Sequence, residues 1–314
     1  MKKLTLTLET VTPLFLGGAD TQAVVLRAQP FRGQLRYWLR AMLGGQGKNA
    51  KEDLRTAESE IFGDTKGGSG IIVRVGIPQG KKLQQEERLV VPHSREFRNK
   101  AFWNGQDQQE ILFELLARPG LSEIPNEALK AFLLWANLGG AGKRARRGFG
   151  SFRVSRAYAD VDVFPEGFER ALYPRLPSDG YELSAQLTNT LHWSLGASVH
   201  SSSTPEFPTF IGGQTKVLVC RKPHPGDYEN AMKTFWNNNL RNDARGLMDN
   251  RAYGYATGGR RASPFHLHLA RSERGYHYIL TAFNARPSPS HSSWDKVQAL
   301  LASCASDYDG QYIW

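Results

Sequence analysis

The sequence predicts an α+β chain with mostly antiparallel sheets. Two kinds of segment predict this class: short ones in which apolar and polar residues alternate, as in strands, and longer ones with an apolar stripe at helical spacing. They follow one another without the regular strand–helix rhythm of a doubly wound parallel sheet. At 314 residues the chain is long enough for two domains.

Alternation predicts strands over 4–9, 71–77 and 181–195, and a hairpin over 265–280 that turns at 272–275. In the longest of these, 181–195, leucines occupy one face and polar residues the other, as in a strand with one solvated face. Apolar stripes predict helices over 31–43, 108–118, 125–138, 228–240 and 293–303. The first of these helices is expected to stop at Gly44-Gly45.

Two basic, glycine-rich segments, 139–150 and 254–263, each follow a predicted helix or its downstream loop and lead into a predicted strand. This shared plan predicts two related βαβ-type halves. The seam between them is expected in the Pro- and Gly-punctuated stretch 165–180.

Composition excludes several classes. Apolar residues make up 40% and charged residues 22%, which excludes a disordered or coiled-coil chain. The chain lacks a run of about 18 apolar residues, which a membrane-spanning helix needs. The start alternates instead of forming a signal-peptide core, and the only cysteines are Cys220 and Cys304. We therefore expect a reducing cytoplasm.

The charge indicates a partner. Lys and Arg total 40 against 30 acids, a net charge of +10, and 26 of the 40 cations are arginines. Residues 1–150 carry 23 cations and 15 acids, whereas 151–314 carry 17 and 15. A localised excess of arginine favours nucleic acid as the partner, with an anionic membrane surface second.

The segment 139–150 is the first candidate site, with five glycines and four cations in twelve residues. Glycines let a backbone approach a ligand closely, and cations hold phosphates. A solvated basic turn is the alternative, which we rank lower. The segment 253–264, with Tyr253, Tyr255, Arg260 and Arg261, repeats the mixture and would suit backbone binding plus base stacking.

Arg32, Arg36 and Arg40 recur every four residues of the first predicted helix. Like charges at this spacing repel. Because the sequence has no acid between Asp20 and Glu52, an external anion is favoured as their partner. Pairing with distant acids is the alternative, and is equally favoured for Arg40. We expect Trp38 in the core.

Catalytic signals are poor. His266, His268 and His277 could share the polar face of the predicted hairpin, and a solvated sheet face is favoured there over a metal site. The sequence lacks the motifs of serine hydrolases, zincin metalloproteases and nucleobase deaminases.

Four motifs occur in the order seen in CRISPR RAMP proteins: Thr12-Pro13-Leu14-Phe15-Leu16-Gly17-Gly18, Phe31-Arg32-Gly33-Gln34-Leu35-Arg36-Tyr37-Trp38, Glu60-Ile61-Phe62-Gly63 and Arg147-Gly148-Phe149-Gly150-Ser151. Arg260-Arg261-Ala262-Ser263-Pro264 resembles a loop in the second half of these proteins. The sequence most resembles the first-subunit family of the type III-B (Cmr) effector module.

The resemblance implies two ferredoxin-like (RRM-like) βαββαβ domains packed together, over 1–170 and 171–314. It implies a non-catalytic RNA-binding subunit without cofactor or metal, near the guide RNA 3′ end and beside other RAMP subunits. Its partners would be guide RNA and single-stranded target RNA, not a membrane. The residues expected to bind RNA are Phe31, Arg32, Arg36, Gly142, Lys143, Arg144, Arg146, Arg147, Phe149, Tyr255, Arg260 and Arg261.

Two other functions stay open. A metal-independent RAMP endoribonuclease that processes guide precursors would need an acid and a base, for which His200 or His93 with Lys143 are the candidates. A membrane-surface protein is ranked last, because the sequence lacks a basic amphipathic helix with an apolar face for lipid.

Overall fold

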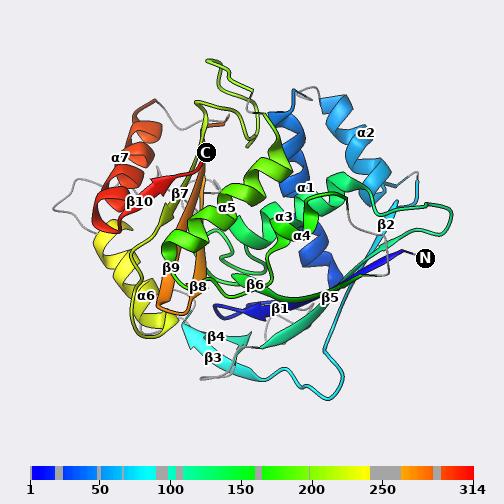
Figure 1. Cartoon of the computed structure of the whole chain (residues 1–314), viewed down its shortest axis with the longest axis horizontal. Coiled ribbons are helices and arrows are strands. Elements are labelled where there is room, and N and C mark those ends of the chain that lie inside the picture. The colour runs from blue at the N-terminus through cyan, green and yellow to red at the C-terminus, as the bar shows by residue number, and fades with distance from the viewer. Residues whose placement is uncertain are drawn as a thin grey trace.

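Two four-stranded antiparallel sheets organise the part of the chain that the structure describes (Figure 1). The structure is a computed structural model, and it describes residues 2–17, 24–47, 51–65, 67–89, 98–103, 109–159, 165–197, 199–240, 263–285 and 291–314. The predicted α+β class with antiparallel sheets is confirmed.

The first half builds sheet 1, with strand order β2-β5-β1-β6. Its elements follow the chain as β1 (Lys3–Thr10), α1 (Ala28–Gly45), α2 (Lys51–Phe62), β2 (Ile71–Gly76), β5 (Glu110–Ala117), α3 (Asn126–Leu138) and β6 (Phe152–Ala159). A separate hairpin of β3 (Gln85–Leu89) and β4 (Arg98–Phe102) interrupts this series between β2 and β5.

The second half builds sheet 2, with strand order β10-β7-β9-β8. Its elements are β7 (Thr215–Cys220), α6 (Tyr228–Phe235) with the π-helical turn η1 (Trp236–Leu240), β8 (Phe265–Ser272), β9 (Gly275–Phe283), α7 (His291–Asp307) and β10 (Gly310–Tyr312). Two helices, α4 (Phe168–Leu172) and α5 (Gly180–Leu195), connect the halves. Both halves therefore repeat one succession of strand, helix, strand, strand, helix and strand, and one order of strands within the sheet.

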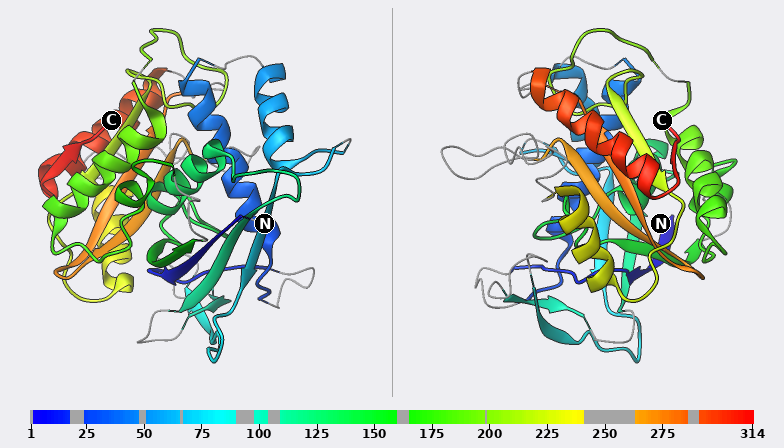
Figure 2. Two further views of the ribbon diagram at one scale, coloured as in Figure 1. Left: turned by 45° about the vertical axis from the view of Figure 1, so that its right-hand side comes forward. Right: turned by 90° about the vertical axis from the view of Figure 1, so that its left-hand side faces the viewer.

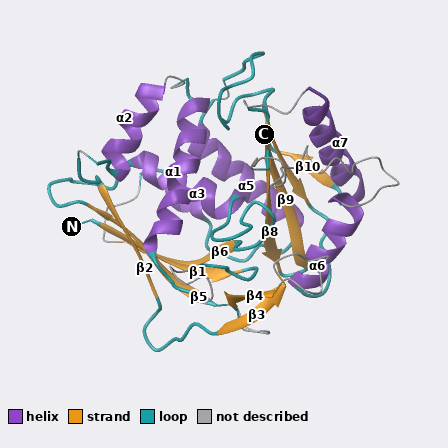
Figure 3. Cartoon of the chain, turned by 180° about the vertical axis from the view of Figure 1, so that it is seen from behind, coloured by secondary structure: helices purple, strands orange, loops and turns teal. Residues whose placement is uncertain are grey.

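The halves share their cores. Leu4, Leu6 and Leu8 of β1 are fully buried in the same cluster as the apolar residues of α1 and α3. Val217 and Ile279 of sheet 2 belong to that cluster too, while their neighbours on the other face of sheet 2 pack with α6 and α7. Figures 2 and 3 show α6 and α7 against one side of sheet 2 and the helices of the first half toward the other. Sheet 2 is thus covered on both faces.

Because sheet 2 is covered on both faces, the prediction that three of its histidines lie on a solvated face is wrong. His266, His268 and His277 are 3%, 2% and 0% exposed. The ring of His266 lies 5.2 Å from that of Trp38, and His268 Nδ1 lies 2.6 Å from the carbonyl oxygen of Gly139. The face that the sequence predicts as solvated faces the first half.

The predicted strand at 181–195 is wrong, because these residues form α5. Asp179 caps this helix, since its side chain accepts hydrogen bonds from the backbone N–H groups of Tyr181 and Glu182. The buried leucines of α5 recur every four residues, a spacing that fits both a helix and alternate positions of a strand. The segment is sixteen residues long and has no turn signal. Its length favours a helix, because strands are most often about 5–6 residues long.

The predicted helix at 108–118 is also wrong: it is the central strand β5. Its buried residues alternate as Ile111, Phe113 and Leu115, but Leu112 and Leu116 on the other face conceal this alternation in the sequence. The other predicted helices correspond to α1, α3, α6 with η1, and α7, and the hairpin turns at 272–275 as predicted. The sequence reasoning missed α2, α4, β3, β4, β7 and β10. No described helix has the length and apolar character needed to cross a membrane.

Candidate nucleic-acid interface

The glycine-rich segment 139–150 connects α3 to β6, and its glycines are required by backbone packing. Gly142 has φ +82°, and a Cβ there would lie 2.3 Å from the carbonyl oxygen of Phe15. Gly150 has φ +63°, and its Cβ would lie 2.0 Å from the carbonyl oxygen of Ala141. Real Cβ atoms do not approach backbone this closely. The glycine density therefore has a structural cause that the sequence reasoning did not consider.

Two of the four cations in this segment face the second half. Arg146 Nη1 donates a 2.6 Å hydrogen bond to the carbonyl of Ser263, and its guanidinium lies 5.0 Å from the centre of the Tyr37 ring. The guanidinium of Arg147 lies 5.5 Å from the Trp236 ring and 5.3 Å from the Phe265 ring. Arg147 thus joins the glycine-rich segment to the second half through cation–π contacts, whereas Arg146 joins it through the hydrogen bond to Ser263 and makes its cation–π contact with Tyr37 of α1.

The other two cations, Lys143 and Arg144, are exposed. The backbone N–H of Lys143 donates to the carbonyl of Phe15 at 2.8 Å, which fixes the turn and leaves the ammonium outward. Arg144 has φ +61°, a conformation that residues with a side chain rarely adopt, and partial burial lowers the pKa of its guanidinium from its ordinary value. Neither side chain has a hydrogen-bond or ion-pair partner among the described residues.

A pocket of about 370 Å³ opens beside Lys143, lined by Phe15, Leu16, Gly17, Pro30, Gln34, Gly142 and Lys143. We name it the Lys143 pocket. The first turn of α1 forms one wall, and this turn has neither a side-chain cap nor an acidic residue. The first N–H groups of a helix have no acceptor within the helix, and together with the helix dipole they favour an anion at this end. The exposed Arg27, whose Nη2 donates to the carbonyl of Gly17 at 3.1 Å, adds a cation at the rim.

The Lys143 pocket can therefore hold a phosphate group. Sequence reasoning identified two of its residues, Gly142 and Lys143, but missed Arg27, Phe15 and Gln34. The signal for Gln34 was present, since it follows Pro30 by one helical turn on the same face.

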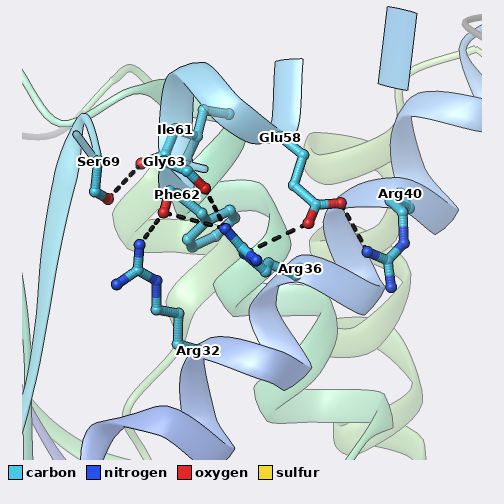
Figure 4. Close-up of polar contacts among 8 residues, drawn as sticks. All are labelled: Arg32, Arg36, Arg40, Glu58, Ile61, Phe62, Gly63 and Ser69. Atoms are coloured by element: carbon cyan, nitrogen blue, oxygen red, sulfur yellow. Dashed lines mark hydrogen bonds and ion pairs between the residues drawn. The ribbon is translucent and has the colours of Figure 1, made fainter. Parts of the chain in front are cut away.

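The row of arginines on α1 faces α2 instead of open solvent (Figure 4). Arg32 and Arg36 both donate to the carbonyl of Phe62 at the end of α2, and Arg36 also donates to the carbonyl of Gly63. Arg40 forms a 2.7 Å ion pair with Glu58, whose other carboxylate oxygen lies 3.4 Å from Arg36 Nε. The sequence favoured an external anion as the partner of these arginines. In the structure, the partners in these contacts are carbonyl oxygens of the chain itself and Glu58.

Removing the two arginines is expected to destabilise the protein. An Arg32→Ala, Arg36→Ala variant should lose roughly 2–4 kcal/mol of unfolding free energy, because both guanidinium groups satisfy terminal carbonyls of a packed helix. Chemical denaturation measures this. Arg55→Ala is the matched control, since Arg55 is an exposed α2 residue without a partner among the described residues. Equal stability of the double variant and the control would contradict the anchoring role.

The remaining predicted residues are placed as follows. The rings of Phe31 and Phe149 are 0% and 2% exposed; Phe31 packs on Trp135 and Phe149 on Phe15, so neither ring is presented to a ligand. Tyr255, Arg260 and Arg261 lie outside the described residues.

The two glycine-rich segments do not occupy comparable places in the repeated succession of elements. Segment 139–150 follows α3, the last helix of its half, and precedes the last strand, β6. Segment 254–263 lies between the first helix of its half and the second strand, β8. The two segments therefore do not support the relation between the halves, which rests instead on the repeated succession of strands and helices.

The described contacts do not bring the candidate endoribonuclease residues together into one site. His93 lies outside the described residues, and His200 forms a bridge with Gly212, whereas Lys143 is held against Phe15. Among the residues that the structure describes, no cluster of three or more His, Cys, Asp or Glu side chains is arranged to hold a metal ion.

Comparisons with known proteins give a consistent result. The family described as the RAMP superfamily matches residues 7–153. The chain is 30% identical to the CRISPR system Cmr subunit Cmr1-2 of Pyrococcus furiosus over 173 residues, which are 47% of this chain and 92% of that protein. It is 28% identical to Cmr1-1 of the same organism over 158 residues, 43% of this chain and 42% of that protein.

Solved structures share the fold. The crystal structure of apo Cmr1 from Pyrococcus furiosus matches with a TM-score of 0.64 at 18% identity, covering 100% of this chain and 99% of that one. A chain in the cryo-EM structure of the type III-B Cmr-β complex bound to cognate target RNA matches with a TM-score of 0.67 at 12% identity, covering 97% and 99%. The 30% identity across nearly all of Cmr1-2 and the match to residues 7–153 agree: the chain belongs to the RAMP superfamily.

Proposed function

We propose that this protein is a non-catalytic, RNA-binding RAMP subunit of a type III-B CRISPR (Cmr) effector ribonucleoprotein. It would lie near the 3′ end of the guide RNA, help capture target RNA in antiviral defence, and work in the cytoplasm beside other RAMP subunits. The observation that carries the proposal is the Lys143 pocket, which has no acidic residue among its described lining residues, in a chain related to Cmr subunits.

The proposal includes two ferredoxin-like domains, 1–170 and 171–314. The repeated succession of elements supports it, since each half has four antiparallel strands with its first and third strands in the centre of the sheet. This is the βαββαβ plan, with the helices of each half joining its strands.

The charge around the pocket supports a phosphate-bearing ligand. Lys143 lines the pocket, its neighbour Arg144 is exposed, and Arg27 donates to the carbonyl of the lining residue Gly17. None of the pocket's described lining residues is acidic. Phosphate contacts of this kind give affinity without reading sequence, which suits a subunit that must accept any guide or target.

A Lys143→Ala, Arg144→Ala variant is expected to bind single-stranded RNA more weakly. The slope of log affinity against log salt should fall by roughly 0.7 for each phosphate that the protein no longer neutralises. Fluorescence anisotropy with a labelled oligouridine at several salt concentrations measures both quantities.

The control is Lys222→Ala, Arg274→Ala, which removes two exposed cations of the second half. It should retain the affinity and nearly the slope of the wild type. An equal loss in both variants would indicate non-specific attraction by the basic surface, and an unchanged Lys143→Ala, Arg144→Ala variant would contradict the site.

A further inference from the structure

Gly33 is an exposed glycine inside α1 for which the fold offers no reason. A Cβ at this position would meet no atom of the described residues within 4 Å. Glycine inside a helix costs about 1 kcal/mol relative to alanine. The other glycines of α1 differ: Gly44 and Gly45 lie where a Cβ would come within 2.3 Å of Thr209 and Phe210. The bare surface at Gly33 therefore points to something outside the chain.

Gly33 lies midway between two pockets. Pro30, three residues earlier, lines the Lys143 pocket, and Arg36, three residues later, lines a second pocket of about 370 Å³ between α1 and α2. Three residues of α-helix turn through about 300°, so Pro30 and Arg36 each stand about 60° from Gly33, on opposite sides of it. The two residues are about 9 Å apart along the helix axis. Gly33 is thus the bare point of a continuous helix face that joins the two pockets.

The second pocket is also cationic. Arg36, Arg40 and Arg55 line it with Glu58 and Asp64. Glu58 is shared by Arg36 and Arg40, whereas the exposed Arg55 has no ion-pair partner among the described residues. We name it the Arg55 pocket, and its surplus charge is positive.

We propose that a single strand of RNA crosses α1 at Gly33, with phosphates in the Lys143 pocket on one side and near Arg55 on the other. This inference rests on the proposed function and adds the path of the strand. A strand whose phosphate groups recur at each nucleotide suits two cationic pockets on either side of one helix. The missing side chain at Gly33 lets the ligand's backbone lie directly on the helix, as glycine does wherever a ligand must come close.

A Gly33→Gln variant tests the path, because glutamine is a good helix former and fills the bare surface. Its unfolding free energy should equal or exceed that of the wild type, while its affinity for a long oligouridine should fall at least about tenfold. Affinity for a di- or trinucleotide that occupies the Lys143 pocket alone should change less than about twofold. Gly33→Ala, with a smaller side chain, should give an intermediate reduction on the long oligonucleotide.

Ala185→Gln is the matched control, since Ala185 is an exposed position of α5. It should bind both oligonucleotides as the wild type does. If Gly33→Gln binds long RNA normally while Lys143→Ala, Arg144→Ala does not, the path over α1 is overturned and the proposed function stands. If the wild type binds neither oligonucleotide, the proposed function and this path both fail. If Gly33→Gln weakens the binding of both equally, the glycine serves the Lys143 pocket and the crossing is overturned.

Discussion

A Gly150→Ala variant is expected to lose roughly 3 kcal/mol or more of unfolding free energy. Gly150 lies at φ +63°, and the added methyl group would lie 2.0 Å from the carbonyl oxygen of Ala141. The two residues are already joined, since Ala141 N–H donates to the Gly150 carbonyl at 3.0 Å and Gly150 N–H donates to the Pro13 carbonyl at 3.0 Å. Relieving the clash would break these bonds next to Ser151, whose Oγ accepts a hydrogen bond from Leu269 N–H of sheet 2 at 3.1 Å.

Gly80→Ala is the control for backbone conformation alone. Gly80 has φ +76°, and a Cβ there would meet nothing within 4 Å. The unfolding free energy of this variant should therefore fall by only roughly 1 kcal/mol, because alanine is unfavourable in the left-handed conformation. Urea denaturation of the two variants separates the effect of the clash from that of the conformation. A Gly150→Ala variant as stable as Gly80→Ala would mean that the segment relaxes freely and that its glycines are not required for packing.

The same segment shows how far the sequence could predict the site. Its glycine and cation density drew attention to a loop that packs closely against Phe15 and Ala141, while phosphate binding by Lys143 stays a prediction. The different roles of the four cations were hidden. Arg146 and Arg147 resemble their basic neighbours in sequence, yet they pack on rings that are distant along the chain, such as Tyr37 and Trp236. Such contacts arise from tertiary packing, within the first half for Tyr37 and between the halves for Trp236, which local patterns do not encode.

The errors in the fold have related causes. The alternating leucines of α5 satisfy two periods at once, and only the length of the segment and the cap at Asp179 favour the helix. Strand β5 lies in the centre of sheet 1, so apolar residues occur on both of its faces. Glu58 was missed as the partner of Arg36 and Arg40 because α2 itself was not predicted. For β5 and Glu58, tertiary contacts decided what local spacing left ambiguous.

The buried histidines give the second large effect, a dependence of stability on pH. Burial lowers the pKa of His268 to about 4, although its hydrogen bond to the Gly139 carbonyl opposes the shift. Burial, and then the charge of Arg146, lower the pKa of His266, whose Nε2 lies 3.0 Å from the hydroxyl of Tyr37. Burial also lowers the pKa of His277, opposed by its hydrogen bond to a backbone carbonyl. All three rings are neutral in the folded protein near neutral pH.

The direction of this pH dependence follows from the number of protons that the folded and unfolded states bind. An unfolded histidine titrates near pH 6.5, so below that pH the unfolded state binds protons that the folded state does not. The stability is fully present above about pH 6.5 and is lost as the pH falls toward the folded pKa, about 4 for His268. Each such histidine contributes up to about 1.4 kcal/mol per pH unit. The unfolding free energy should therefore fall as the pH drops from 7 to 5, most surely through His268, whose folded pKa lies near 4.

Urea denaturation between pH 7 and pH 5 measures this slope. His268→Gln should reduce it by about 1.4 kcal/mol per unit near pH 5, because the amide can still donate to the Gly139 carbonyl but takes up no proton. His192→Gln, at an exposed position of α5, is the matched control for the substitution itself. A wild-type stability that is flat from pH 7 to pH 5, or equal slopes in the wild type and His268→Gln, would show that this face of sheet 2 opens to solvent. Because that face is where the two halves meet, the slope reports directly on whether they stay packed together.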